Sequence, residues 1–132
     1  MDTTLSGFHH VKLPVSDIHR SLQWYERVLG LRVQLEFVEE GVLRGVALAD
    51  PGETIGLALR HDPERAAGIA GFDPVALCVP GPDALLAWQR RLEDLGEPHG
   101  GIVTGHVGSV IVGLHDPDGI EIRLYQPAGG ES

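Results

Sequence analysis

The sequence contains VKLPVSDIHRSLQWYERV at residues 11–28 and a related stretch, VALCVPGPDALLAWQRRL, at residues 75–92. The two stretches match at six positions, which are Val11/Val75, Leu13/Leu77, Val15/Val79, Leu22/Leu86, Trp24/Trp88 and Arg27/Arg91. An arbitrary register would give about one or two matches at ordinary residue frequencies, and a matched tryptophan pair is rarer still. The offset then grows by two, and Asp50-Pro51 aligns with Asp116-Pro117. The chain is therefore an internal repeat.

Each half of the repeat predicts the same succession of elements. Residues 8–15 alternate in polarity with the period of a half-buried strand. Ser16 and Asp17 are suited to cap a helix that ends at Gly30. Three strands are expected next, near 32–38, 42–49 and 54–60. The second half repeats this pattern with a strand at 74–79, a helix at about 82–95, and strands near 101–104, 108–115 and 120–126.

The predicted fold is α+β, in one domain that covers residues 1–132. Module one spans about residues 7–61, a linker spans 62–71, and module two spans about 72–127. Each strand has one apolar face that its helix can cover, so the opposite faces of the sheets are free to line a cavity. We therefore expect a cavity enclosed between the two modules.

Composition and charge narrow the classes of function. A formal net charge of -9 argues against nucleic-acid binding, because phosphate recognition needs clustered Lys and Arg. No apolar run approaches the roughly 20 residues of a membrane span, and the first residues lack the pattern of a signal peptide. We expect a cytoplasmic protein. The single cysteine, Cys78, cannot form an intrachain disulfide, and its apolar neighbours favour a buried, inert thiol.

Strand alternation indicates which side chains line the cavity. The expected lining comprises Phe8, His10, Lys12, Pro74, Ala76, Cys78, Glu121, Arg123 and Tyr125. His9 is expected on the opposite face from His10. Structural roles remain open for the polar members: Glu121 and Arg123 could pair with one another, and His10 could be an ordinary hydrogen-bonded histidine.

The sequence contains FHHVKLPVSDIHRSLQWYERVLGL at residues 8–31 and HDPDGIEIRLYQP at residues 115–127. Both segments resemble the vicinal oxygen chelate superfamily, which includes glyoxalases, bleomycin-resistance proteins, fosfomycin-resistance transferases and extradiol dioxygenases. The resemblance implies two βαβββ modules that form a curled mixed sheet around a cavity. It also implies the pairing of modules within or between chains, from which we expect a homodimer.

The resemblance further implies four metal-ligand positions, matched here by His10, Leu57, Pro74 and Arg123. Leucine and proline offer no donor atom, and a guanidinium cannot ligate a cation. Glu121 lies on the same strand face as Arg123 and could join His10, but two ligands fall short of the three that are typical of catalytic zinc. We expect no metal or other cofactor. If a divalent metal binds, its ligands are expected to be His10 and Glu121.

Two classes of function stay open at this point. The first is a protein that binds a small organic molecule without metal. The ligand-binding residues are then His10, Lys12, Cys78, Glu121, Arg123 and Tyr125, and the cationic groups favour an anionic ligand. The second is an enzyme, either a metal-dependent lyase, transferase or dioxygenase with a rebuilt site, or a metal-free catalyst with His10 as general base.

Overall fold

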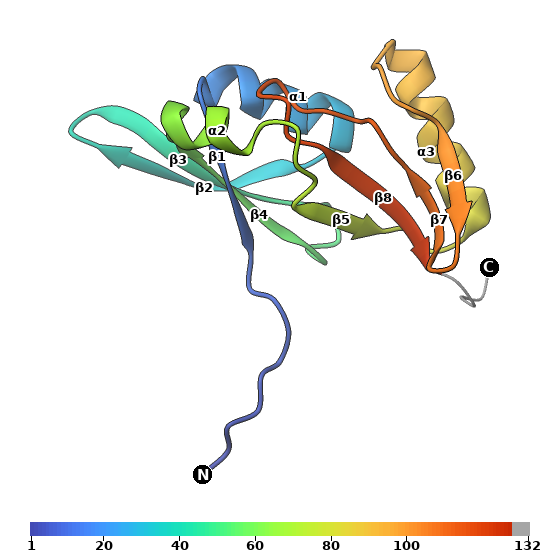
Figure 1. Cartoon of the computed structure of the whole chain (residues 1–132). Coiled ribbons are helices and arrows are strands. Elements are labelled where there is room, and N and C mark those ends of the chain that lie inside the picture. The colour runs from blue at the N-terminus through green and yellow to red at the C-terminus, as the bar shows by residue number, and fades with distance from the viewer. Residues whose placement is uncertain (128–132) are drawn as a thin grey trace.

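The computed structural model describes residues 1–127, and its first module follows the predicted order (Figure 1). The elements of this module are β1 (Val11–Val15), α1 (Ile18–Leu29), β2 (Arg32–Glu39), β3 (Val42–Ala49) and β4 (Gly56–His61). The predicted linker contains a short helix, α2 (Pro63–Ile69), which packs on β1.

The second module repeats the order of the first. Its elements are β5 (Val75–Cys78), α3 (Pro82–Leu95), β6 (Ile102–Gly105), β7 (Gly108–Ile111) and β8 (Ile122–Pro127). The predicted α+β class with two βαβββ modules is confirmed. Several strands are shorter than predicted. In particular, β1 begins at Val11, so residues 8–10 lie outside the strand.

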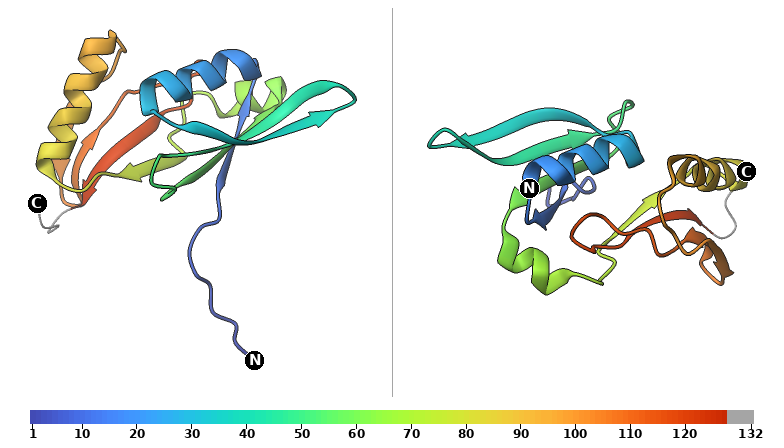
Figure 2. Two further views of the ribbon diagram at one scale, coloured as in Figure 1. Left: turned by 180° about the vertical axis from the view of Figure 1, so that it is seen from behind. Right: turned by 90° about the horizontal axis from the view of Figure 1, so that it is seen from above.

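The strands form two separate four-stranded sheets, which do not close into one barrel (Figure 2). The first sheet has the order β1-β4-β3-β2 and the second has the equivalent order β5-β8-β7-β6. In each sheet the first strand of the module runs parallel to the last, and the other neighbours are antiparallel. The edge strands are therefore β1 and β2 in the first sheet, and β5 and β6 in the second.

The main helices begin and end where the sequence predicts. The Asp17 side chain accepts a hydrogen bond from the Arg20 backbone N–H, at 3.1 Å, and so caps the start of α1. Gly30 and Gly96 end α1 and α3 with φ angles of 71° and 68°. This left-handed conformation costs glycine little and other residues more, so the two matched glycines stop the two helices.

The two modules share one apolar core. Hydrogen bonds also join the modules. The buried Tyr25 hydroxyl of α1 donates to Asp116 Oδ2 at 2.6 Å. Arg91 of α3 donates to the Val28 backbone carbonyl at 2.9 Å. The Ser16 backbone N–H donates to Asp118 Oδ2 at 3.0 Å.

The Tyr25–Asp116 pair lies in a protected environment. Burial, and then the Asp116 carboxylate, raise the pKa of Tyr25, which keeps its hydroxyl protonated as a donor. Burial also raises the pKa of Asp116, although hydrogen bonds from Tyr25 and from the backbone oppose this change.

Among residues 1–127, no helix is both long enough and apolar enough to cross a membrane.

Candidate functional site

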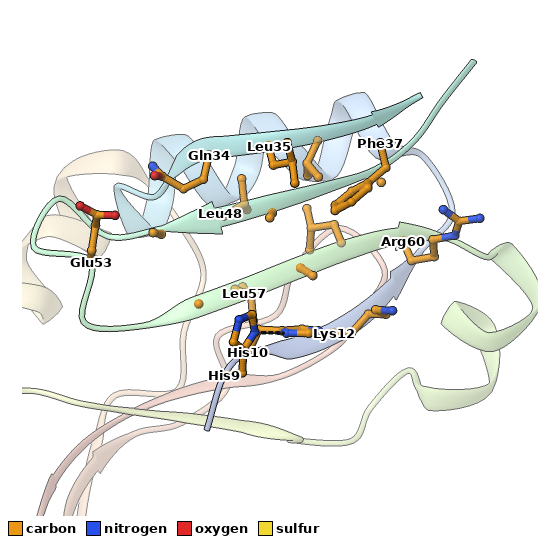
Figure 3. A pocket seen from close by; sticks show the side chains of 17 residues that line it. His9, His10, Lys12, Gln34, Leu35, Phe37, Leu48, Glu53, Leu57 and Arg60 are labelled. Atoms are coloured by element: carbon orange, nitrogen blue, oxygen red, sulfur yellow. Dashed lines mark hydrogen bonds between the residues drawn. The ribbon is translucent and has the colours of Figure 1, made fainter. Parts of the chain in front are cut away.

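The larger of two adjoining cavities lies on the face of the first sheet that is turned away from α1 (Figure 3). We call this side the open face of the first sheet. The cavity has a volume of about 670 Å³, and all of its lining residues come from the first module.

Small residues make up the floor of this main cavity. They come from the two central strands and are Gly45, Ala47 and Ala49 of β3 and Gly56 and Ala58 of β4. The register places Ala47 opposite Ala58 and Ala49 opposite Gly56. Because the intervening residues Val46, Leu48, Leu57 and Leu59 are buried in the core, the strand alternation places these short side chains on the open face.

The β2 strand provides an apolar wall. Leu35 lies opposite Ala47, and Phe37 lies opposite Gly45. A Cβ atom on Gly45 would stand 3.6 Å from Phe37 Cδ2 and 3.0 Å from the Leu59 carbonyl oxygen. The Phe37 ring therefore leans over the space that Gly45 leaves free, while 43% of the residue stays exposed to solvent.

His10 and Lys12 line the opposite side of the cavity (Figure 3). Lys12 lies opposite Ala58 in the parallel pairing of β1 and β4. It is the only lysine in the sequence. Arg60, also in the lining, donates two hydrogen bonds to Glu39, at 2.9 and 3.0 Å, and holds the pKa of that carboxyl below its usual value. Among the described residues Lys12 has no such carboxylate partner, so it is the cation of the lining that is free to meet a ligand.

A second cavity of about 440 Å³ adjoins the first and is lined by both modules. Its lining consists of residues 8–11, 54–57 and 74–77. The two cavities share His9, His10, Gly56 and Leu57. His10 therefore stands at the junction between the main cavity and the space that leads to β5.

His9 lies beside His10, and the prediction that the two rings point to opposite faces is wrong. Their Nδ1 atoms are 2.8 Å apart, and the ring planes meet at 79°. Both residues precede the start of β1, so strand alternation does not apply to them. Gly56 fits tightly below, because a Cβ there would stand 2.8 Å from the His9 carbonyl oxygen.

The predicted site residues in β8 and just before it do not line either cavity. The Arg123 Nε donates to Glu121 Oε2 at 2.7 Å, and its guanidinium also lies 3.3 Å from Asp73. Glu121 additionally accepts a hydrogen bond from the Gly113 backbone N–H. Burial opposes ionisation of Glu121, but the hydrogen bonds from Arg123 and Gly113 lower its pKa overall. The sequence left open whether Glu121 and Arg123 pair with one another, and the structure shows that they do.

Cys78 and Tyr125 lie opposite one another in the pairing of β5 and β8. The Cys78 thiol is exposed, so the expectation of a buried thiol is wrong. It borders a small separate cavity of about 120 Å³, together with Trp88 and Leu124. The structure therefore brings together His10 and Lys12 of the predicted ligand-binding set, and places Cys78, Glu121, Arg123 and Tyr125 elsewhere.

Comparison with known proteins agrees with this architecture. Residues 7–124 match the family model described as the "Glyoxalase/Bleomycin resistance protein/Dioxygenase superfamily". The chain belongs to this superfamily.

Two relatives of the superfamily show similarity in sequence. The chain is 30% identical to "Putative ring-cleaving dioxygenase MhqA" of Bacillus subtilis, over 96% of this chain but only 42% of that protein. It is also 30% identical to "Lactoylglutathione lyase" of Pseudomonas putida, over 91% of this chain and 84% of that protein. The chain thus spans less than half the length of MhqA.

Solved structures share the fold at lower sequence identity. A superfamily domain from Frankia sp. EAN1pec aligns with a TM-score of 0.76 and 20% identity, over 97% of this chain and 96% of that one. TnmS3, described as an antibiotic binding protein from Streptomyces sp. CB03234, aligns with a TM-score of 0.74 and 21% identity, over 96% of this chain and all of that one.

The strand register corrects one of the four ligand positions of the superfamily. Ala76 pairs with Arg123 in the second module, and the equivalent Lys12 pairs with Ala58 in the first. The counterpart of Arg123 is therefore Ala58, while Leu57 is buried in the core. The shift arises because the segment between Asp50 and β4 is one residue longer than the repeat offset assumed.

The corrected set of positions is His10, Ala58, Pro74 and Arg123, which does not fit a metal ion. Alanine, like leucine, offers no donor atom, so His10 remains the only ligand that these positions supply. Within residues 1–127, no three His, Cys, Asp or Glu side chains are grouped closely enough to hold a metal.

Proposed function

We propose that this protein binds a small organic molecule in the main cavity on the open face of the first sheet, without the superfamily's metal. The observation that carries the proposal is the cavity itself. Its volume of about 670 Å³ falls in the usual range for small-molecule sites. Apolar and small side chains form most of its lining, and a few polar groups stand at its edges, as is typical of such sites.

A cavity-filling variant tests where the ligand binds. Ala47→Phe places a large ring on the floor of the main cavity, whereas Ala67→Phe places the same ring on the exposed surface of α2. We expect small molecules that raise the melting temperature of the wild-type protein to lose this effect in Ala47→Phe and to keep it in Ala67→Phe. Stabilising molecules that act equally on both variants would overturn the proposal.

We also propose that the purified protein carries no stoichiometric divalent metal, because three of the four ligand positions lack a suitable donor. Elemental analysis after purification without chelators is the measurement. About one zinc, iron, manganese or nickel ion per chain, lost in His10→Ala, would contradict this part of the proposal.

A metal-free enzyme is the second candidate, and the contact between His9 and His10 favours it. A hydrogen bond between the two Nδ1 atoms requires one ring to donate and the other to accept. A histidine fixed in this way at the junction of two cavities could take a proton from a bound molecule. Chemical change of a bound compound that is lost in His10→Gln, while binding persists, would favour this candidate.

The homodimer predicted from the resemblance is part of the proposal. The chain has a mass of 14.2 kDa, so light scattering at micromolar concentration should give a mass near twice this value. A mass near that of one chain would refute the dimer.

A further inference from the structure

The open face of the first sheet carries a row of four residues that crosses all four strands. Lys12 pairs with Ala58, Ala58 with Ala47, and Ala47 with Leu35. In the next row, Arg60 pairs with Gly45, and Gly45 with Phe37. The first row therefore has two alanines at its centre, the second row has Gly45 beside Arg60, and both rows end in an apolar side chain of β2.

The dimensions of this surface favour a flat occupant. The four strands span three spacings, so the distance from β1 to β2 is about 14 Å. No side chain longer than a methyl group rises from Ala47, Ala49, Gly56 or Ala58 between these strands. An aromatic ring system about 3.5 Å thick can lie on such a floor in van der Waals contact across its whole face.

The apolar end of the rows can contact the edge of an aromatic molecule. Phe37 and Leu35 are 43% and 54% exposed, which is a large exposure for apolar side chains beside a cavity. Aromatic pairs gain energy in edge-to-face and offset arrangements beyond the burial of their surface. Phe37 can offer either arrangement to a ring that rests on the floor.

The opposite end of the first row is cationic. Lys12 has no carboxylate partner among the described residues, whereas Arg60 is engaged by Glu39. Glu53 and Gln34 line the far end of the cavity from Arg60 (Figure 3), and a carboxylate there disfavours an anion. An anionic group of a ligand is therefore directed to Lys12 and its neighbour His10.

We infer that the ligand is a flat aromatic anion, whose rings lie on Ala58 and Ala47 against Phe37 and whose carboxylate or sulfonate meets Lys12. This inference rests on the proposed function, since it specifies the class of molecule that occupies the same cavity. The flat shape and the negative charge of the ligand are separate properties, and each can be tested alone.

Three probes of similar size distinguish the two properties. They are 2-naphthoate, which is flat and anionic, 2-naphthylmethanol, which is flat and neutral, and adamantane-1-carboxylate, which is anionic and globular. We expect wild-type protein to bind 2-naphthoate about fivefold or more tightly than either of the others, measured by isothermal titration calorimetry.

Variants assign each property to a residue. Lys12→Gln should weaken 2-naphthoate about fivefold and leave 2-naphthylmethanol unchanged, because only the anion loses a charge-assisted contact. Arg90→Gln removes the same charge from the exposed surface of α3 and should change neither affinity. Phe37→Leu should weaken both flat probes about threefold while the adamantane probe changes little. A general structural defect would not move these affinity ratios.

Because Lys12 is the only lysine in the sequence, its contact with the anionic group of a ligand can be observed directly. Reductive methylation with 13C-formaldehyde labels Lys12 and the α-amino group alone and keeps their charges. We expect 2-naphthoate to shift the 13C NMR signal of methylated Lys12 and to leave the signal of the methylated α-amino group unchanged.

The outcomes separate this inference from the proposed function. Equal affinity for 2-naphthylmethanol or adamantane-1-carboxylate, or an unchanged ratio in Lys12→Gln, would overturn the flat anion. If one of the probes bound the wild-type protein and Ala47→Phe blocked that binding, the proposed function would stand. Absence of binding by all three probes would overturn the inference as well, and the comparison of Ala47→Phe with Ala67→Phe would then decide the proposed function independently.

Discussion

The open faces of the two sheets carry different side chains at equivalent positions. Where the first sheet has the pair Gly45 and Arg60, the second has Val110 and Tyr125. Val110 is 6% exposed, so its side chain fills the space that Gly45 leaves empty. The repeat thus keeps one strand arrangement in both modules, but β3 has a glycine on its open face where β7 has a buried valine.

Charge is also distributed differently on the two sheets. The first sheet has Lys12 on β1 and Ala58 on β4, whereas the second has Ala76 on β5 and Arg123 on β8. The second sheet neutralises its cation with Glu121, at the position equivalent to Gly56. Within residues 1–127, Lys12 of the first sheet has no such carboxylate partner and is available to a ligand.

Exchanging the residues on β3 and β7 tests the comparison most strongly. Val110→Gly should lower the free energy of unfolding by about 3 kcal/mol, because it removes a buried side chain and adds backbone freedom within a strand. Gly45→Val should cost about 1–3 kcal/mol, since its Cβ would stand 3.0 Å from the Leu59 carbonyl oxygen, and should abolish ligand binding. Urea unfolding and thermal shift measure both effects. A cost below about 1 kcal/mol for Val110→Gly would contradict the view that Val110 fills the second sheet.

The two matched Asp-Pro turns allow a second test. Asp116 is buried and accepts hydrogen bonds from Tyr25, Asp118 and Ile120, whereas Asp50 binds Thr54 near the surface. Tyr25→Phe should therefore cost about 2 kcal/mol, and Thr54→Val about 0.5 kcal/mol. The midpoints of urea unfolding at constant slope give both values. Equal losses in the free energy of unfolding for Tyr25→Phe and Thr54→Val would mean that burial does not distinguish the two turns.

The charge pair on the second sheet predicts a dependence of stability on pH. The pKa of Glu121 is lowered in the folded protein, so its stabilising contribution is complete above the ordinary value of 4.5 and is lost as the pH falls through the folded value. Glu121→Gln should thus cost about 1 kcal/mol at pH 7, and the difference from wild type should shrink in acid. Glu36→Gln, on the exposed edge strand β2, is the control. A difference that grows below pH 4.5 would reverse the sign and refute the assignment.

The sequence predicted the fold well where the signal was periodic. Alternation placed Leu13 and Val15 in the core, and matched glycines marked the ends of α1 and α3. The superfamily was recognised from two segments, because they hold the strand and turn residues that the fold requires.

The predictions for the site failed where local register or strand limits matter. Ala58 was missed as the counterpart of Arg123 because the loop before β4 has no matched residues that reveal its length. His9 was misplaced because β1 starts later than its alternating pattern. The floor of the main cavity does have a sequence signal, since glycine or alanine occupies every second position at 45–49 and 56–58, but its meaning depends on the pairing of β3 with β4.

The hydrogen bond between Tyr25 and Asp116 has a consequence for how the chain folds. Its partners lie 91 residues apart, and Ser16 and Asp118 are separated by 102. Contacts of such long range form only after much of the chain is ordered, which slows folding in general. Tyr25 of α1 has its acceptor, Asp116, in the turn before β8. Each half of the repeat therefore exposes unsatisfied polar groups and apolar surface until the other half has packed against it. The duplicated halves therefore form one cooperative unit, in which neither half can be lost or replaced without exposing the interior of its neighbour.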